Sequence, residues 1–445
     1  MHIRKKVYIE TYGCQMNVSD SEVAAAILQE NDYILTNDID RTDIVLINTC
    51  SIRENAEQRI YGRIQALNRK KQEKQGLIVG IIGCMAERLK EKLLDKEKSV
   101  DLLAGPDAYR DLPGLLAAAG NGQKPVNVKL LKEETYSDID PLRFKSNGIT
   151  AFVSIMRGCE NMCTYCVVPF TRGAERSREP QSIINEIKTL VNTGYKEVTL
   201  LGQNVNSYLS ENINFAGLLE KTAAIEPGLR IRFATSHPKD LTDEVLHVMA
   251  KYKNICKNIH LPVQSGSSLI LSLMNRRYDR DYYLNRVEAI RKIIPECGIS
   301  TDIMVGFCDE TEEDHAETLS LMKKAGFDFS YMFRYSERPN TYAARKLVDN
   351  VQEKVKIRRL TEVIELQNML SKESHNKDIG KTVEVLIEGV SKKSENDLYG
   401  RNSQNKVVVF PKGTYQPGDY AIIEITSCTS ATLLGKPVKM NIPTI

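Results

Sequence analysis

Short apolar runs alternate with longer amphipathic stretches through the first part of the chain. The apolar runs are rich in β-branched residues, which favours strands, whereas the stretches between them have helical spacing of apolar positions. The strand-like runs cover residues 6–13, 43–49 and 77–83. The helical stretches cover residues 19–29, 54–72 and 86–95. Strands that alternate with helices in this way predict a parallel sheet built from βαβα units.

The alternation resumes after residue 150 with a longer series of strands. Strand-like runs cover residues 151–156, 197–201, 230–234, 258–261, 300–305 and 330–334. Helical stretches between them cover residues 182–192, 242–251, 282–294 and 312–325. The series predicts a partial (β/α)6 barrel, and in barrels of this kind the active site lies at the carboxyl ends of the strands.

The C-terminal part of the chain changes its period again. Residues 352–377 have the apolar stripe of one long amphipathic helix. Short strand-like runs follow at residues 382–387, 406–410 and 420–425, separated by turns that contain glycine and proline. This pattern predicts a small closed β-barrel.

The whole pattern therefore predicts an α/β protein of several domains, for which 445 residues are sufficient. The predicted parts are an N-terminal parallel βαβ domain at residues 1–120, a linker at 121–147, the partial barrel at 148–373 and the all-β barrel at 374–445.

Composition adds the cellular setting. The net charge is +3, so any nucleic-acid binding must come from local patches of the surface. No run approaches the ~20 apolar residues of a membrane span, and the N-terminus does not resemble a signal peptide. We therefore expect a cytoplasmic protein without a membrane association. In that compartment the ten cysteines stay reduced and favour metal–thiolate chemistry over disulfides.

Three cysteines lie close together directly after the first strand of the predicted barrel. Cys159, Cys163 and Cys166 have the spacing Cys-x3-Cys-x2-Cys, and three thiolates this close select zinc, Cu(I) or an iron–sulfur cluster. Structural zinc sites take four ligands, and no fourth Cys or His lies near these three in the sequence. A [4Fe–4S] cluster with one open iron therefore suits the spacing better than the alternative, a structural knuckle.

Three further cysteines occupy equivalent positions in the N-terminal pattern. Cys14, Cys50 and Cys84 each follow a strand-like run. Because the carboxyl ends of parallel strands meet at one sheet edge, we expect the three thiols to gather there and to hold a second cluster. One such cysteine is ordinarily a small buried residue, but three at the same topological position are hard to explain by packing. The remaining cysteines show no ligand-like spacing and are interpreted as buried or incidental thiols: Cys256, Cys297, Cys308 and Cys428.

Polar residues follow several strands of the predicted barrel. The candidates for cofactor contacts are Gln203, Asn204, Ser236 and Gln264, with His237 a weaker candidate because it precedes a proline and could only shape the turn. Each has a plain alternative, such as a helix cap for Ser236. Charged Glu175, Arg176 and Arg178 could contact substrate or form a solvated surface turn. No residue is assigned a catalytic role.

Basic residues are scattered through the predicted C-terminal barrel: Lys392, Lys393, Arg401, Lys406, Lys436 and Lys439. They could meet the phosphates of a nucleic acid. Acidic residues nearly balance them, so a solvated surface is the usual interpretation of this pattern.

The sequence around the cysteines resembles a known family. The spacing of Cys159, Cys163 and Cys166, with Tyr165 before the last of them, resembles the signature of radical S-adenosylmethionine (SAM) enzymes. Four stretches resemble the methylthiotransferases within that group: Thr11-Tyr12-Gly13-Cys14-Gln15-Met16-Asn17, Asn48-Thr49-Cys50-Ser51-Ile52-Arg53-Glu54-Asn55-Ala56, Gly83-Cys84-Met85-Ala86, and Cys163-Thr164-Tyr165-Cys166-Val167-Val168-Pro169-Phe170-Thr171-Arg172-Gly173. The run Gln15-Met16-Asn17 is similar to the corresponding run in the branch that acts on N6-isopentenyladenosine in tRNA. The sister branches usually carry other residues there.

The resemblance spans nearly the full chain and implies a function. It implies two [4Fe–4S] clusters, SAM as cofactor, a C-terminal TRAM domain that binds RNA, and addition of a methylthio group to C2 of N6-isopentenyladenosine next to the anticodon. One SAM would supply the methyl group and another the radical. The implied partners are the tRNA anticodon stem-loop, an electron-donor protein and a sulfur donor, and the chain is expected to be a monomer. Two alternatives stay open: the same chemistry on threonylcarbamoyladenosine or a ribosomal-protein aspartate, and a non-catalytic RNA-binding protein stabilised by metal.

Two loops depart from the family pattern. Cys308 and Asp309 stand where Pro and Gly are usual, and Asn340 and Tyr342 stand where Gly and Pro are common. Asp tolerates turn geometry and Asn can adopt the left-handed conformation that Gly favours. We therefore expect both loops still to form.

Overall fold

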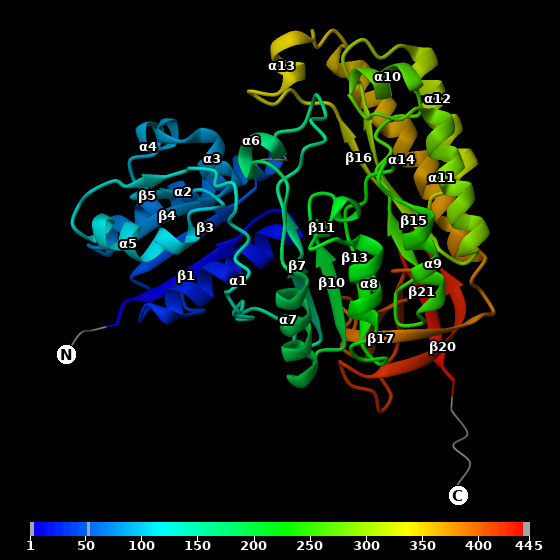
Figure 1. Cartoon of the computed structure of the whole chain (residues 1–445), viewed down its shortest axis with the longest axis horizontal. Helices are drawn as coiled ribbons and strands as arrows, with labels where there is room; N and C mark the ends of the chain where they lie inside the picture. Colours follow the sequence, from blue (N-terminus) through cyan, green and yellow to red (C-terminus); the bar gives the residue numbers. More distant parts are fainter. Residues whose placement is uncertain (1–3, 51–53, 439–445) are drawn as a thin grey trace, which may run out of the picture.

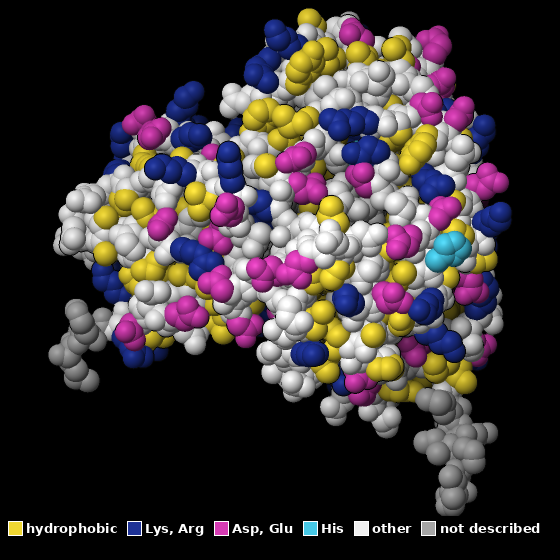
Figure 2. Space-filling view, in the orientation of Figure 1, with side chains coloured by type: hydrophobic (Ala, Val, Ile, Leu, Met, Phe, Trp, Pro, Cys, Tyr) yellow, Lys and Arg dark blue, Asp and Glu magenta, His cyan; other side chains and the backbone are white. Residues whose placement is uncertain are grey.

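The computed structural model describes residues 4–50 and 54–438, with the side chains of residues 54–57 left out of the description. Three parts are visible in Figure 1: a parallel sheet with helices, a central half-barrel, and a small barrel at the C-terminal end. Acidic and basic side chains are interspersed over the face shown in Figure 2, as expected for a net charge of +3. Among the described helices, none has the length and apolar character that crossing a membrane requires.

The N-terminal part is a six-stranded parallel sheet in the order β2-β1-β3-β4-β5-β6. The strands are β1 (Lys6–Thr11), β2 (Ile34–Leu35), β3 (Ile44–Thr49), β4 (Ile78–Gly83), β5 (Leu102–Ala104) and β6 (Val126–Asn127). Side chains alternate between the two faces, so Ile44 and Leu46 pack into one core while Val45 and Ile47 pack into the other. The predicted parallel βαβ domain is confirmed.

Helices cover both faces of this sheet. They are α1 (Gln15–Glu30) and α5 (Leu112–Gly120) on one face, and α2 (Glu54–Glu73), α3 (Cys84–Leu89) and α4 (Glu91–Lys96) on the other. The single helix expected at residues 86–95 is wrong, because Lys90 has a φ of +50° and divides it into α3 and α4. Strand β6 adds to the sheet edge from within the stretch expected to be a linker.

The central part is the predicted partial barrel. Its strands, in spatial and sequence order, are β7 (Thr150–Ser154), β10 (Glu197–Leu201), β13 (Arg230–Phe233), β14 (Asn258–His260), β15 (Gly298–Val305) and β16 (Phe329–Arg334). Two three-stranded parallel sheets are joined by a bridge between Ile231 and Ile255. The outer helices are α7 (Pro180–Asn192), α8 (Phe215–Ala223), α9 (Asp243–Lys251), α11 (Arg280–Ile293) and α12 (Glu312–Ala325). Helix α8 was not among the predicted elements.

Shorter elements lie at the carboxyl end of these strands. They are β8 (Met156–Arg157), α6 (Val168–Arg172), β9 (Arg176–Ser177), α10 (Ser268–Leu273) and α13 (Tyr342–Lys346). The two loops with unusual residues do form: Asp309 and Asn340 adopt φ values of +62° and +71°. The expectation that these residues can adopt the backbone conformation that glycine favours is confirmed.

Helix α14 (Glu353–Asn376) leads to a closed barrel in the order β17-β18-β19-β21-β20. Its strands are β17 (Thr382–Val390), β18 (Asp397–Asn402), β19 (Val407–Pro411), β20 (Tyr420–Cys428) and β21 (Leu433–Pro437). The predicted barrel is confirmed, although β18 and β21 were not expected.

The small barrel docks on the amino ends of the central strands. Arg230, at the start of β13, donates to the carbonyl of Arg401 (2.7 Å), and Arg232 donates to the carbonyl of Asn402 (2.8 Å). The hydroxyl of Tyr420 donates to the carbonyl of Lys196, just before β10 (3.2 Å). The carboxyl end of the central strands is therefore left for the N-terminal domain and for the site.

Candidate active site

Cys14, Cys50 and Cys84 are brought together at one edge of the N-terminal sheet. They follow β1, β3 and β4, which are neighbours in that sheet. The loop that carries Cys14 runs directly against Cys50, because a Cβ atom added to Gly13 would lie 2.3 Å from the Cβ of Cys50. Cys50 and Cys84 are buried, whereas Cys14 is exposed. The edge therefore offers three thiols with access from one side.

A buried amide cluster holds this edge in place, and the sequence pattern did not predict it. Asn17 donates through Nδ2 to Oδ1 of Asn48 (3.1 Å), and Asn48 donates through Nδ2 to the carbonyl of Asn17 (2.9 Å) and to Oγ of Ser21 (3.0 Å). These bonds join the first turns of α1 to the end of β3. The thiol of Cys14 also donates to Oδ1 of Asn17 (3.2 Å).

A guanidinium group stands beside these thiols. The hydrogen bond with Cys50, assisted by the positive charge of Arg172, lowers the pKa of Cys14 to about 6. Burial raises the pKa of Cys84, and the charge of Arg172 opposes that rise. Since the thiolate is the form that binds metals, Arg172 favours the metal-binding state of this group.

The second set of cysteines occupies the loop after β8. The backbone N–H of Cys159 donates to the carbonyl of Gly173 (3.2 Å), and that of Cys166 donates to the carbonyl of Cys163 (3.0 Å). Burial and the neighbouring charge of Cys163 raise the pKa of Cys166 to about 12. Arg276, which is buried, donates through Nη1 to Sγ of Cys163 (3.3 Å).

Glycine is required immediately before this loop. Gly158 has a φ of +79°, and a Cβ there would lie 1.9 Å from the carbonyl oxygen of Ala174. Any side chain would push apart the two arms of the loop, so the run Gly158-Cys159 follows from backbone geometry.

The donor chemistry at both places fits an iron–sulfur cluster. Each site offers three soft sulfur donors and a buried arginine, Arg172 or Arg276, that offsets thiolate charge. The side chains are not yet arranged as a ligand set: within residues 4–50 and 58–438, no three His, Cys, Asp or Glu side chains converge closely enough to hold a metal ion. Binding therefore requires the cysteine side chains to turn toward a common point.

Buried polar atoms without partners surround the mouth of the central barrel. The atoms, each inaccessible to solvent, are Oε1 of Gln203, Oδ1 of Asn204, Oγ of Ser236 and Nε2 of His237. Leaving a buried polar atom unpaired costs about 1–3 kcal/mol, so a group of such atoms at strand ends is a candidate place for a ligand or ordered water to supply the missing bonds. The helix-cap alternative for Ser236 is wrong, since its hydroxyl has no partner among the described residues and the N-cap of the next helix, α9, is Thr242.

Neighbouring residues position Asn204 and Gln264 at the mouth and determine the charge of His237. Asn204 donates through Nδ2 to Asp240 (2.7 Å), which directs its Oδ1 away from that carboxylate. Gln264 has a φ of +74° and its backbone is bonded to both Asp302 and Met304 on β15. Burial and the charge of Arg276 lower the pKa of His237 to about 2, so its imidazole is neutral at ordinary pH.

Family comparisons agree with this geometry. Three models match the chain: Uncharacterized protein family UPF0004 at residues 6–105, the Radical SAM superfamily at 153–322 and the TRAM domain at 376–438. The tRNA-2-methylthio-N(6)-dimethylallyladenosine synthases of Bacteroides fragilis and Bacteroides thetaiotaomicron are 56% and 57% identical over 439 residues, which is 98% of this chain and 96% of each relative. The chain belongs to this synthase family. The synthase of Amoebophilus asiaticus is similarly 56% identical, over 98% of this chain and 93% of its own length.

Solved structures share the fold of this synthase family member at low sequence identity. The radical S-adenosylmethionine methyltransferase TsrM from Kitasatospora setae aligns with a TM-score of 0.59 and 12% identity, covering 76% of this chain and 75% of that one. The cobalamin-dependent radical enzyme OxsB aligns with a TM-score of 0.54 and 11% identity, covering 82% and 56%. These likenesses concern the fold alone.

Buried ion pairs join the two sets of cysteines across the domain boundary of the synthase. Asp20 on α1 is completely buried and accepts hydrogen bonds from Arg157 and Arg172 (2.7 Å each). Arg157 immediately precedes the loop of the second set, and Arg172 follows that loop on α6. Asp107, after β5, accepts a bond from Arg176 (2.7 Å). The positions of the two sites are thus coupled through Asp20.

The solvated surface turn considered for Arg176 and Arg178 is wrong, whereas contact with a substrate stays a prediction. The two side chains are buried, so they form no solvated turn, and both are already bound by protein groups. Arg178 donates to Glu186 and to Oγ of Ser182 (2.9 Å from Nε). Arg176 holds the domain interface through Asp107, whereas these bonds of Arg178 stay within the central domain. Glu175 is half-buried, and burial raises its pKa.

The remaining cysteines have packing roles in the structure. Cys256, Cys297 and Cys308 are buried, and Cys308 lies in a small cluster with Phe307 and Tyr335. The thiol of Cys428 donates to Oδ1 of Asn376 (3.1 Å).

Some basic residues of the small barrel are paired with acidic residues of the protein itself. Lys406 is buried and bonded to Asp378 (2.7 Å), so its suggested role at phosphates is wrong. Arg401 pairs with Glu388 (3.2 Å) and Lys436 with Glu424 (3.3 Å), while Lys392 and Lys393 are exposed. Lys439 lies outside the described residues.

Proposed function

We propose that this chain is a radical SAM methylthiotransferase that adds a methylthio group to C2 of N6-isopentenyladenosine next to the anticodon of tRNA. The full-length match to the synthase family carries this conclusion. The structure supports it by placing two groups of three cysteines on facing edges of two domains, with Asp20 between them.

Each group of residues has a distinct task in this proposal. Cys159, Cys163 and Cys166 would hold one [4Fe–4S] cluster, and Cys14, Cys50 and Cys84 would hold the other. The bound clusters and SAM supply the radical and the methylthio group, a chemistry that no side chain can perform at an aromatic C–H.

The chain's own polar groups would bind and orient SAM at the barrel mouth. We assign this role to Gln203, Asn204, Ser236 and Gln264, because the first three carry buried atoms without a partner and Gln264 stands at a strand end beside them. Neutral His237 can accept a hydrogen bond at Nε2. Arg172 and Arg276 would stabilise the charge of the thiolates.

The proposed partners follow from the same reaction. The substrate is the anticodon stem-loop of tRNA, with the small C-terminal barrel as a second RNA contact, and an electron-donor protein and a sulfur donor support turnover. Because both groups of cysteines come from one chain, the site is complete in a monomer. We place this monomer in the cytoplasm, where tRNA is modified.

Nucleoside mass spectrometry tests the proposal directly. The cluster-reconstituted chain is incubated without oxygen with SAM, a reductant and tRNA bearing N6-isopentenyladenosine, and the digested nucleosides are analysed. We expect the 2-methylthio derivative. Release of 5′-deoxyadenosine without that product would point to another substrate, and neither product from protein with intact clusters would refute the catalytic assignment.

A further inference from the structure

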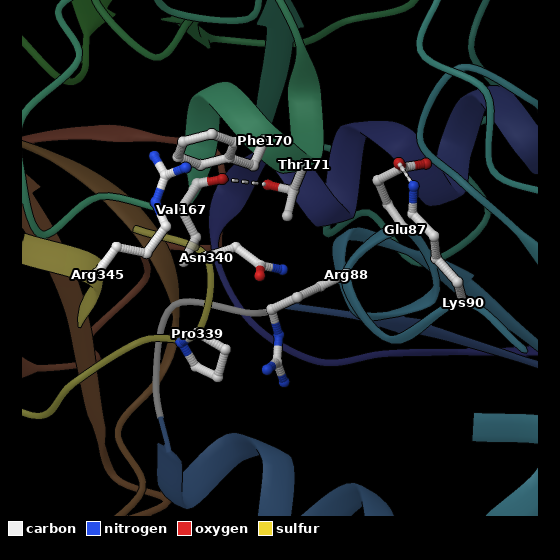
Figure 3. Close-up of a pocket in the computed structure, with 9 residues that line it drawn as sticks. All are labelled: Glu87, Arg88, Lys90, Val167, Phe170, Thr171, Pro339, Asn340 and Arg345. Carbon is white, nitrogen blue, oxygen red and sulfur yellow. Dashed lines mark hydrogen bonds and ion pairs between the residues drawn. The ribbon is translucent and has the colours of Figure 1, made fainter. Parts of the chain in front are cut away.

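A pocket of about 330 Å³ opens between the N-terminal domain and the carboxyl end of the central barrel. It lies where α3, α6 and the loop before α13 meet, and Figure 3 shows side chains from all three segments. Helix α3 begins at Cys84, and Val167 directly follows Cys166. The lining residues from α3 and α6 therefore follow one cysteine of each group closely in the sequence.

One wall of the pocket presents an aromatic ring to solvent. Phe170, on α6, is 39% exposed although it lies between two domains. Its ring lies next to Val167, and both residues line the pocket together with Pro339 (Figure 3). An exposed aromatic side chain in a concave site is suited to stacking against a planar ligand.

Positive charge surrounds that ring. Arg345, on α13, donates through Nε to the carbonyl of Thr341 (3.4 Å), and its guanidinium lies beside Phe170. Arg88 lines the pocket from the side of α3, on the other side of Asn340 in Figure 3. Among the lining residues, the one carboxylate is that of Glu87, whose Oε1 lies 3.5 Å from Nζ of Lys90. The pocket thus combines an aromatic face with two cations.

Asn340 adds a polar group at the centre of this arrangement. Its left-handed backbone, with a φ of +71°, lets an amide stand where the family commonly has glycine, and the side chain lies between the two arginines. An amide has both donors and acceptors and can pair with the edge of a base.

We propose that this pocket binds a nucleotide of the RNA loop, with Phe170 stacked on the base and Arg345 and Arg88 bound to the flanking phosphates. Asn340 would contact the edge of the stacked base. The inference rests on the proposed function and adds the place where the loop docks. RNA loops are recognised mainly by stacking of splayed bases on aromatic side chains and by arginines at the backbone, which is the combination present here.

Binding of a fluorescently labelled anticodon stem-loop that carries N6-isopentenyladenosine tests the inference. Anisotropy titrations would use the cluster-reconstituted full chain and its Phe170→Ala, Phe170→Trp and Arg345→Ala variants. We expect Phe170→Ala to weaken binding about tenfold or more, and Phe170→Trp to retain it. Arg345→Ala should lower the slope of log affinity against log salt by ~0.7, the value for one phosphate of a single strand.

Two matched controls make the result specific. Phe329→Ala removes an exposed ring at the opposite end of β16, and Lys346→Ala removes an exposed cation next to Arg345 outside the pocket. Both should bind RNA like the wild type.

Wild-type affinity and salt slope in both Phe170→Ala and Arg345→Ala would overturn the inference, even if the wild type makes the methylthio product. A wild-type chain that neither binds nor modifies the RNA would instead refute the proposed function itself.

Discussion

The two ends of the central barrel differ in how their long polar side chains are bonded, although Ser330 at the amino end also keeps a hydroxyl without a partner among the described residues. At the carboxyl end, Gln203, Ser236 and His237 each keep a buried atom without a partner. At the amino end, Arg230 and Arg232 are equally buried, yet they donate to backbone carbonyls of the small barrel. Both ends are polar, so polarity alone does not distinguish a site from an interface. The two ends are distinguished by whether these long side chains already have hydrogen-bond partners in the protein.

The difference has an energetic meaning. Unpaired buried atoms cost about 1–3 kcal/mol each, and a bound ligand or an ordered water at the carboxyl end would remove that cost. The paired arginines at the other end contribute to stability. This division matches the general rule that chemistry resides at the carboxyl ends of barrel strands and stability at the amino ends.

The largest effects should come from replacing the cysteines. The two groups of cysteines should give different results, which distinguishes the two sites. Replacing Cys163 with Ala should abolish SAM cleavage, because three thiolates are needed to hold that cluster. Replacing Cys50 with Ala should spare some SAM cleavage and stop methylthiolation. Quantification of 5′-deoxyadenosine and of the modified nucleoside distinguishes these results. Cys428→Ser, away from both sites, serves as the control, and full product from Cys50→Ala would refute the second site.

A large loss of stability should follow from Asp20→Asn. This change leaves Arg157 and Arg172 without their shared carboxylate in a fully buried place, and breaking a buried pair typically costs about 3–5 kcal/mol. Urea unfolding followed by circular dichroism measures the loss. Asp32→Asn, which breaks an exposed pair with Arg4, should change stability by less than about 1 kcal/mol. Equal effects of the two variants would show that Asp20 is not a structural centre.

A smaller loss is expected at the amino end from Arg232→Lys. Lysine keeps the charge near Glu197 but cannot also reach the carbonyl of Asn402. We expect a loss of about 2 kcal/mol in unfolding experiments, with SAM cleavage unchanged. A strong decrease in SAM cleavage at full cluster content would contradict the division between the two ends.

The smallest effect concerns the pH dependence of stability at the carboxyl end. Burial lowers the pKa of His237 to about 2, so the folded chain binds fewer protons there than the unfolded chain, in which the pKa is about 6.5. The contribution of neutral His237 to the free energy of unfolding is present above about pH 6.5. Below that pH it is lost by up to ~1.4 kcal/mol per pH unit. His237→Gln should remove this part of the slope in urea unfolding between pH 6.5 and 5, with the exposed His247 replaced as a control. An unchanged slope would mean that His237 is accessible to protons.

Much of the fold could be predicted from the sequence because local patterns determine it. The six barrel strands fall within a few residues of their predicted positions, since each is a short apolar run between amphipathic helices. Strands β18 and β21 were missed because they carry Asp397, Arg401, Gly435 and Lys436, which mask the strand pattern. Helix α1 begins at Gln15 rather than at residue 19, since buried amide contacts replace the apolar spacing in its first turn.

The candidate site was predictable in its chemistry and less so in its supports. The cysteines are visible because their spacing or their position after strands repeats. Asp20 pairs with residues 137 and 152 positions away, and no local pattern connects them. Asp20 lies among both polar and apolar buried residues of α1, so the helix pattern gives no signal of its partners. Phe170 lies within the stretch 163–173 that resembles the methylthiotransferases, but only the structure shows that its ring is exposed.

The carboxylate of Asp20 also limits how this chain can be recombined with its relatives. A chimera that joins the N-terminal domain of one homologue to the barrel of another inherits acidic residues from one parent and arginines from the other. Asp20 and Asp107 would then depend on finding cations at positions 157, 172 and 176 in a foreign partner. The transferable unit is therefore this set of charges, which crosses the boundary at which the domains would be cut.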